Sequence, residues 1–317
     1  MMKRRTILGS AVVLAGAALA QEVKPAQRVL VQDGRIDVMA GGKLALSYHT
    51  ADVPPPPGVK KVFRKSAFIH PLNTPSGGTM TGIHPDDHYH HTGIWHAWVK
   101  TKHGLDEPDF WNLSAHKGRV RFSKYREIID TPRVAGFEVA QEQIAYKGKE
   151  STETVVLAET LRVEVRQQGS LNIVDYLVTQ KNVSGVALEL PAYRYGGPLA
   201  YRGPLNWNKE NSEYLTSEGK TRADSHTTRA NWCAVFGPTD QGEGTLLFLG
   251  SPQNYDAPQR LRTWPEGKMF LNWAAVQEKG MTMQAGDTHV FSYRLITADR
   301  KLSAAEADAL YDAWAKK

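Results

Sequence analysis

The sequence predicts an all-β protein, a single large antiparallel β-sandwich with one short helix at its carboxyl end. Short runs of alternating apolar and polar residues recur along the chain, and most end at Gly, Pro or Asp, as is typical of strands with one buried face. No alternation of strand and helix patterns occurs, which disfavours a parallel α/β fold. The 317 residues are 41% hydrophobic and 23% charged, so they can build one large core.

Residues 1–20 resemble a secretory signal peptide. A Lys-Arg-Arg triplet precedes an apolar run over residues 7–20, which is short for a membrane span. Residues 18–20 have the small-x-small form of a cleavage site, so we expect cleavage before Gln21 and a mature domain over residues 21–317. The Arg-Arg pair also resembles a twin-arginine export signal, and an uncleaved membrane anchor is the alternative. A periplasmic or secreted protein without stable membrane insertion is predicted.

Charge and cysteine content exclude several classes of protein. The formal net charge is +6 at pH 7, and the three basic residues of the predicted signal account for half of it. The remaining basic residues are interspersed with acidic ones, which disfavours nucleic acid as a partner. The one cysteine, Cys233, lies in an apolar run, so we expect it to be buried, with no internal disulfide and no all-cysteine metal site. No phosphate loop, dinucleotide fingerprint or serine nucleophile elbow occurs.

The strands can be placed in order along the chain. Residues 29–32 and 36–40 flank Asp33-Gly34 and predict a hairpin. The four prolines at 54–57 predict an extended connector that neither a helix nor a central strand can contain. Further strands are predicted at 119–123, 136–140, 154–158, 161–165, 171–178, 232–236, 245–249 and 289–297.

A helix is predicted over residues 303–314. Ser303 is a suitable N-cap, and Glu306 stands three residues later, at the spacing of a capping box. The apolar residues expected to cover the edge of a sheet are Leu302, Ala305, Ala309, Leu310 and Trp314.

Eight of the eleven histidines fall between His70 and His116. Histidine titrates near neutral pH and is also the commonest metal ligand, so acid–base and metal roles are both open. In an extended segment His88 and His90 would share one face and His91 the other, whereas His84 could join them only through a bend. A carboxylate such as Asp87 could orient a neighbouring imidazole. Three interpretations remain: a structural cluster, a metal site, or a metal-free site for a polar ligand.

We predict no metal and no other cofactor. A catalytic zinc uses three protein ligands, and the His-x-His pair at residues 88–90 has no third ligand at a diagnostic spacing. The protein purified without added metal is expected to carry less than one transition ion per chain.

Polar and aromatic residues elsewhere suit a carbohydrate ligand. Trp95 and the segment Asp109-Phe110-Trp111-Asn112 offer indole faces and an amide, which suit the C–H faces and hydroxyls of sugars. Core packing is the alternative for the tryptophans. Arginines beside Gly, Pro or aromatic residues could bind a carboxylate or vicinal hydroxyls, with salt bridges as the alternative. These arginines are Arg119, Arg194, Arg202 and Arg229.

These motifs resemble a family of exported bacterial proteins labelled PmoA-like or "methane oxygenase", over roughly residues 60–315. Residues 87–95 are similar to its Asp-His-x-His-His-Arg-Gly-Leu-Trp motif, with Thr92 in place of the arginine. The segment Ser251-Pro-Gln-Asn254 is also similar, with Ser251 where the family more often has histidine. The resemblance implies a sandwich of the galactose-mutarotase type and no established chemistry. Mutarotase-type proteins use histidine and a carboxylate for proton transfer.

The function predicted is acid–base chemistry by an exported carbohydrate-active protein, such as epimerisation, hydrolysis or elimination on a sugar or sugar derivative. His88 and His90 are the candidates for proton transfer, with Asp87 as the carboxylate and Glu210 or Asp256 as alternatives. A non-catalytic carbohydrate-binding module with a structural histidine cluster, and a histidine-ligated metal enzyme, are the alternative functions. The candidate ligand-binding residues are His84, His91, Trp95, Trp111, Asn112, Arg119, Arg194, Arg202, Arg229 and Asn254.

Overall fold

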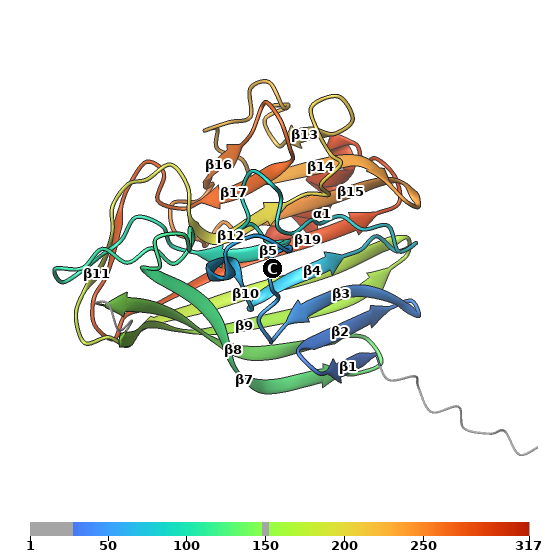
Figure 1. Cartoon of the computed structure of the whole chain (residues 1–317). Coiled ribbons are helices and arrows are strands. Elements are labelled where there is room, and N and C mark those ends of the chain that lie inside the picture. The colour runs from blue at the N-terminus through green and yellow to red at the C-terminus, as the bar shows by residue number, and fades with distance from the viewer. Residues whose placement is uncertain (1–27, 148–151, 317) are drawn as a thin grey trace, which may run out of the picture.

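A computed structural model describes residues 28–147 and 152–316, and the predicted signal peptide lies outside these residues. Two antiparallel sheets of eight strands dominate the fold (Figure 1), and a three-stranded sheet lies at one end. In spatial order, the first sheet holds β1 (Val29–Gln32), β2 (Arg35–Ala40), β3 (Lys43–His49), β4 (Phe68–Leu72), β5 (Ile94–Ala97), β12 (Gly197–Arg202), β17 (Phe270–Ala274) and β16 (Arg260–Thr263).

The second sheet is built largely from long strands that follow one another as a meander. In spatial order it holds β13 (Glu213–Thr216), β14 (Trp232–Thr239), β15 (Gly242–Gly250), β19 (Thr288–Ala298), β10 (Leu171–Asn182), β9 (Thr152–Gln168), β8 (Ala135–Lys147) and β7 (Gly118–Asp130). The third sheet holds β18 (Met281–Met283), β11 (Leu188–Leu190) and β6 (Lys102–His103). The two helical segments are η1 (Lys61–Phe63), a 3₁₀ turn, and α1 (Ala304–Ala315). The predicted all-β sandwich with a short carboxyl-terminal helix is confirmed.

The strand predictions hold, with one exception. The hairpin turn at Asp33-Gly34 joins β1 to β2, and the four prolines lie outside helices and strands. The two strands expected at 154–158 and 161–165 are a single strand, β9. The sequence suggests a break because Glu159 interrupts the apolar alternation. In the fold Glu159 faces inward and is only 3% exposed, because partners in the core hold its carboxylate.

A polar network surrounds Glu159 between the two large sheets. Its carboxylate accepts hydrogen bonds of 2.7–3.2 Å from four side chains, which are His96, Gln141, Gln143 and Gln180. His96 Nδ1 also bonds the Tyr176 hydroxyl at 2.8 Å. Burial raises the pKa of Glu159, but the His96 partner and the amide donors outweigh burial, and its net pKa is lowered. A buried charge is tolerated in a core when hydrogen bonds surround it in this way.

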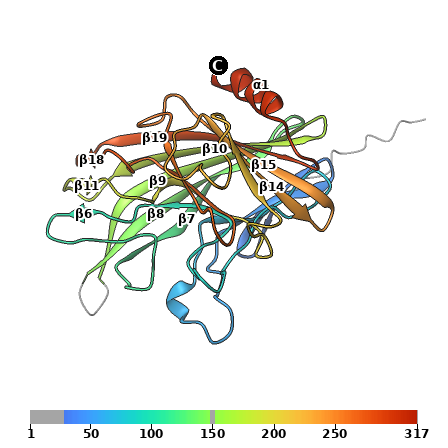
Figure 2. The ribbon, with the colours of Figure 1, turned by 90° about the horizontal axis from the view of Figure 1, so that it is seen from above.

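The rest of the space between the large sheets is apolar, and a second apolar cluster lies under α1. Figure 2 shows α1 on the outer side of the second sheet. The predicted capping box between Ser303 and Glu306 is present. Ala307 is buried and Tyr311 partly buried, whereas Ala305 and Ala309 are exposed. The expectation for these two alanines is wrong, because the apolar face is centred on Ala307 with Leu310, Tyr311 and Trp314.

Two further sequence predictions concern burial and membranes. Cys233 on β14 is buried as expected, and burial raises its thiol pKa. Over the residues that the structure describes, no helix has the length and apolar character needed to cross a bilayer.

Candidate functional site

The histidine segment between β4 and β5 folds as a hairpin of turns, so the alternation that an extended segment would give does not apply. Ile83 and Thr92 form an antiparallel bridge. The backbone N–H of His84 donates to the His91 carbonyl, and that of His91 donates to the His88 carbonyl, both at 2.9 Å. Gly93 has a φ of +56°, and a Cβ there would meet the Ile69 carbonyl at 2.0 Å, so only glycine lets the hairpin close against β4.

These turns bring together three imidazole rings that a strand would have separated. The ring centroid of His91 lies 4.8 Å from that of His88 and 4.6 Å from that of His90. The distance between His88 and His90 is 5.6 Å. His84 is buried, and its Nδ1 bonds the Tyr89 carbonyl at 2.7 Å, so it braces the hairpin.

An aromatic wall supports the histidines on the outer face of the first sheet. His91 stacks on Phe270, with a centroid distance of 5.0 Å and an interplanar angle of 16°. Trp95 lies 5.0 Å from His91 and 4.9 Å from Trp111. Trp264, half-buried in the loop after β16, lies 4.9 Å from His88. Trp95 and Trp111 therefore lie in the cluster, and both are fully buried, as the alternative of core packing requires.

Asp87 connects His88 to a buried arginine. Arg202 ends β12, pairs with Phe270 across the sheet, and has a side chain that is 0% exposed. Its Nη2 donates to both carboxylate oxygens of Asp87, at 2.8 and 3.1 Å. Asp87 Oδ2 lies 3.4 Å from His88 Nδ1. Partial burial raises the pKa of Asp87, but the charge and hydrogen bonds of Arg202 outweigh it and lower the net pKa, so the carboxylate is ionised near neutral pH.

The three neighbouring histidines differ in exposure. Burial lowers the pKa of His88, and Asp87 opposes that effect. The His88 side chain is 38% exposed although its Nδ1 is buried, so the exposed part of the ring lies away from Asp87. Burial, followed by the charge of Lys65, lowers the pKa of His90 to about 3. Burial holds the pKa of His91 well below its usual value. His88 is the one of the three that is both accessible and paired with a carboxylate.

Lys65 is a member of this cluster that the sequence does not reveal. It lies just before β4 in an Arg-Lys-Ser stretch typical of solvated surface, yet it is 1% exposed. Its Nζ lies 4.9 Å from the centre of the Trp95 ring. Burial, followed by the charge of Arg119, lowers its pKa well below the usual value. Sequence analysis does not place Trp264 or Phe270 beside the histidines, because both residues lie far from them in the chain.

Several buried donors of the cluster make no hydrogen bond within the described part of the protein. These atoms are Lys65 Nζ, Trp95 Nε1, Trp111 Nε1 and Arg202 Nε. Most buried polar atoms in proteins have partners, and a group of exceptions in one cluster is typical of a site that receives acceptor atoms from a ligand.

Asn112 and Arg194 lie at the edge of the aromatic wall. Asn112 binds Asp109 and accepts a hydrogen bond of 3.2 Å from the Tyr195 hydroxyl, and the Tyr195 ring lies 5.5 Å from Trp111. Arg194 is exposed and lies over the rings of Tyr193 and Tyr195. Asn112 thus directly follows Trp111 in the chain, whereas Arg194 is connected to Trp111 only through the ring of Tyr195.

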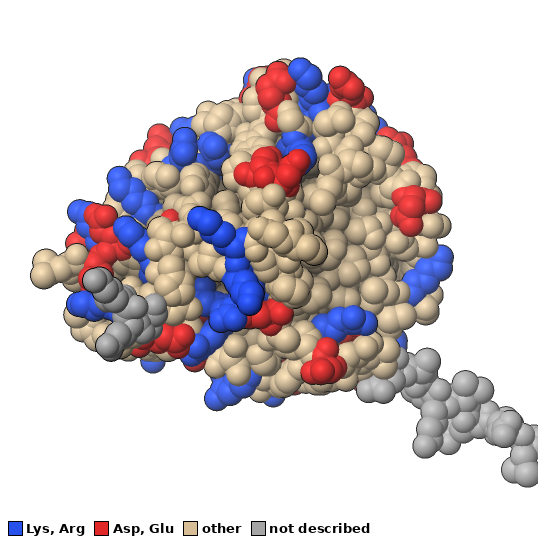
Figure 3. Space-filling model, in the orientation of Figure 1, with Lys and Arg blue, Asp and Glu red and all other residues tan. Residues whose placement is uncertain are grey.

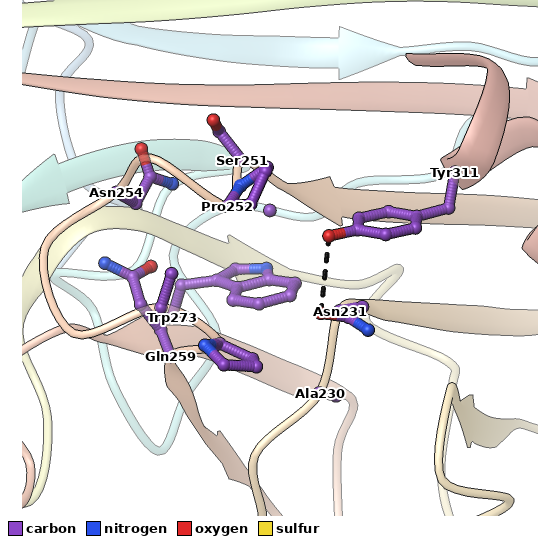
Figure 4. A pocket seen from close by; sticks show the side chains of 11 residues that line it. Ala230, Asn231, Ser251, Pro252, Asn254, Gln259, Trp273 and Tyr311 are labelled. Atoms are coloured by element: carbon purple, nitrogen blue, oxygen red, sulfur yellow. Dashed lines mark hydrogen bonds between the residues drawn. The ribbon is translucent and has the colours of Figure 1, made fainter. Parts of the chain in front are cut away.

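Arg229 and Asn254 have other partners. Arg229 forms ion pairs with Asp256 at 3.1 Å and Glu278 at 2.8 Å. Asn254 bonds the backbone of Ser292 through both ends of its amide and lines a separate cavity of about 60 Å³ between the first sheet and α1 (Figure 4). These contacts brace loops, so the structure does not bring either residue into the histidine cluster.

The structure distinguishes the three candidate carboxylates. Asp256 is paired with Arg229, and Glu210 is exposed in a turn. Asp87 is the one of these three beside a candidate histidine. Among the described residues, no three His, Cys, Asp or Glu side chains are grouped so that they could hold a metal ion.

Fold and site together define an all-β sandwich that carries a histidine- and tryptophan-rich polar cluster on the outer face of one sheet. The chain belongs to DUF6807, a family of unknown function that matches residues 35–312. Comparison with curated proteins found no match.

Three solved structures share similarity with the chain, at low identity. The GH36 α-galactosidase AgaB from Geobacillus stearothermophilus is 12% identical, with a TM-score of 0.44, over 87% of this chain and 42% of that one. The heparan sulfate lyase HepC from Pedobacter heparinus is 10% identical, with a TM-score of 0.38, over 88% and 38% of the two chains. The polysaccharide lyase BACCELL_00875 is 10% identical, with a TM-score of 0.33, over 74% and 31%. This chain spans less than half the length of each.

Proposed function

We propose that the protein binds a carbohydrate at the His88–Trp264 face of the cluster and transfers a proton through His88. The observation that carries this proposal is the connected set Arg202, Asp87 and His88, in which a buried guanidinium holds a carboxylate 3.4 Å from a half-exposed imidazole. A base oriented by a carboxylate is the common arrangement for proton transfer in enzymes.

The residues around His88 suit a sugar. The half-buried indole of Trp264 lies 4.9 Å from the imidazole and offers a face for ring C–H groups. Asn112 and the Tyr195 hydroxyl supply partners for sugar hydroxyls at the edge of the wall. The unpartnered donors of Lys65 and Arg202 favour an acceptor-rich ligand.

The proposed chemistry assigns different roles to the histidines. His88 would accept a proton from the sugar and return it, with Asp87 stabilising the imidazolium that forms in between. His90, with a pKa lowered by burial to about 3, would stay neutral and form hydrogen bonds. Epimerisation, hydrolysis and elimination all use such a step. Asp87 and Arg202 are positioning residues, because they act through His88.

A non-catalytic carbohydrate-binding module is the second candidate. The observation that favours it is the stacking of His91 between His88 and Phe270, at 4.8 and 5.0 Å, since rings packed in this way stabilise a hairpin without titrating. In that case His88 would contribute contact area and no turnover.

Saccharide turnover by the mature protein separates the two candidates. Mono- and oligosaccharides would be incubated with wild type, His88→Ala and the control His289→Ala, which changes a histidine on β19, and products followed by nuclear magnetic resonance. Removal of a general base lowers turnover by about 10²–10⁴-fold, so His88→Ala is expected to lose activity while His289→Ala keeps it. Binding without turnover in wild type would establish the binding module. Full turnover in His88→Ala would refute the role of His88.

Trp264→Ala tests the binding face separately. Loss of one aromatic stacking partner is expected to weaken saccharide affinity about 3- to 10-fold, as the energy of an aromatic contact predicts. Calorimetric titration with the same panel measures this effect. Unchanged affinity would place the ligand elsewhere.

We also propose that the protein is exported, because residues 1–20 have the signal pattern described above. Mass spectrometry of the mature amino terminus tests cleavage before Gln21. Membership of the PmoA-like family remains a prediction, and the proposed chemistry does not depend on it.

A further inference from the structure

A second, larger cavity lies beside the histidine cluster. It has a volume of about 530 Å³, which is within the range of roughly 300–1,000 Å³ usual for small-molecule sites. Four of the residues that line it carry positive charge, namely Lys60, Lys61, Arg64 and Arg119. Figure 3 shows Lys and Arg side chains gathered near the middle of the face seen in Figure 1.

The positive charge of this cavity is only partly neutralised. Among the residues that the structure describes, no Asp or Glu lines it. Asp52, close by, forms an ion pair with Arg119 and a second with Arg64 at 3.4 Å. Among the described residues, Asp52 is thus the one carboxylate that forms an ion pair with any of these four cationic side chains. The Arg119 side chain is 15% exposed, and its buried Nε makes no hydrogen bond within the described residues.

The segment that includes η1 connects the cavity to the histidine cluster, because Lys61 and Val62 line the cavity and Phe63 faces the histidine hairpin. Phe63, the last residue of η1, lies 6.5 Å from His90 and 5.8 Å from Tyr89. Leu113 and Ser114 on the opposite wall directly follow Trp111 and Asn112 in the chain. In Figure 2 the segment that carries the short helix η1 projects from the first sheet, on the side away from α1. A ligand longer than one sugar could therefore reach from His88 past η1 into the cavity.

Two stacked rings line part of the cavity. The ring of His116 stacks on that of Tyr146, with centroids 4.4 Å apart and an interplanar angle of 18°, and both residues line the cavity. Cationic walls above stacked rings suit a pyranose that bears a negative group, because arginine and lysine pair with carboxylate or sulfate oxygens while a ring face packs on the aromatic surface.

We propose that the cavity lined by Lys60, Lys61, Arg64 and Arg119 binds the carboxylate or sulfate group of a sugar residue adjacent to the one held at His88. The inference rests on the proposed function and narrows its substrate class to anionic oligosaccharides. The two anions share the same recognition chemistry, so the experiment distinguishes them.

Calorimetric titration of the mature protein with three tetrasaccharides tests the proposal: one neutral, one of uronic acids and one sulfated. Wild type is compared with Lys60→Ser/Lys61→Ser and with the control Lys181→Ser/Lys279→Ser, which removes two exposed lysines from β10 and the loop after β17. The first pair is expected to weaken binding of an anionic tetrasaccharide by about fivefold, the sum of two exposed charge pairs. The neutral tetrasaccharide and the control pair should show no change.

Salt and inorganic sulfate separate this inference from the proposed function. Raising ionic strength should weaken the anionic ligands and leave the neutral one unchanged. The anionic tetrasaccharide whose affinity is reduced more in Lys60→Ser/Lys61→Ser, relative to wild type, identifies the anion. Inorganic sulfate alone should bind wild type and His88→Ala equally, and Lys60→Ser/Lys61→Ser more weakly. If sulfate shows this pattern and no saccharide binds, the proposed function fails and the anion site stands. Equal affinity of wild type and Lys60→Ser/Lys61→Ser for all anions, or an equal loss in the control pair, would overturn the inference.

Discussion

Two polar clusters lie on opposite faces of β5. Each cluster contains one of two adjacent residues of that strand. His96 points into the core and joins the network around Glu159, whereas Trp95 points outward and packs under His91 and Lys65, as the alternation of a strand requires. In the core network the carboxylate has four hydrogen-bond donors. In the outer cluster several buried donors have no acceptor within the described residues.

The hydrogen bonding of the core network indicates a structural role, whereas the unpaired donors of the outer cluster support the ligand site that we propose there. A network with all its hydrogen bonds made rigidifies the core. A cluster that keeps buried donors unpaired loses stability, and such a loss is typical of sites that bind or react. The presence of histidine would not distinguish the core network from the outer cluster, since both contain it.

Glu159→Leu should have the largest effect, because it leaves His96 and three glutamine amides without their acceptor. Breaking a buried charge network costs about 3–5 kcal/mol of unfolding free energy. Urea denaturation of the variant measures it. Glu189→Leu, at an exposed position on β11, is the control and should stay within about 0.5 kcal/mol of wild type. A loss below 1 kcal/mol in Glu159→Leu would show that the network is dispensable.

Lys65→Met should change the free energy of unfolding in the opposite direction, by stabilising the fold. It replaces an unpartnered buried amine by an apolar side chain of similar length, and removal of an unsatisfied buried group should stabilise the fold by about 2 kcal/mol. The same denaturation experiment gives the value, and saccharide titration should show weaker binding. Destabilisation of the variant would mean that the Lys65 amine stabilises the fold. The outer cluster would then not differ from the core network in its effect on stability.

His90→Gln should flatten the dependence of stability on acid. Burial lowers the pKa of His90 from 6.5 to about 3 in the fold, so between these values the unfolded chain binds the extra proton. The stability contributed by neutral His90 is complete above pH 6.5 and is lost as the pH falls towards 3. Between pH 7 and 5.5 the wild type should lose about 1 kcal/mol more than the variant. If the unfolding free energies of wild type and His90→Gln changed equally with pH, His90 would not be buried in a neutral state.

His88→Asn should have the smallest effect on stability, within about 0.5 kcal/mol, because the ring is half-exposed. Thermal unfolding measures this, while turnover of a saccharide substrate should fall sharply. A large loss of stability would assign His88 to the fold, as the binding-module alternative implies.

Local patterns were enough to predict some features and not others. Alternating runs predicted the strands, and Ser303 with Glu306 predicted the helix start, because these features depend on near neighbours in the chain. The split of β9 was wrong because the partners of Glu159 come from β5, β8 and β10. The helix face was misassigned at Ala305 and Ala309, since the fold decides which side of α1 meets the sheet.

The sequence by itself determined that the protein is an all-β sandwich with a histidine-rich segment beside aromatic residues, since alternation and composition are local properties. Only the tertiary structure decided which residues form the site. The hairpin of turns joins His88, His90 and His91, β12 and β17 bring Arg202 and Phe270 beneath them, and Lys65 arrives from the segment before β4. Burial and pairing depend on contacts between residues distant in the chain, and these contacts set the charge of each side chain.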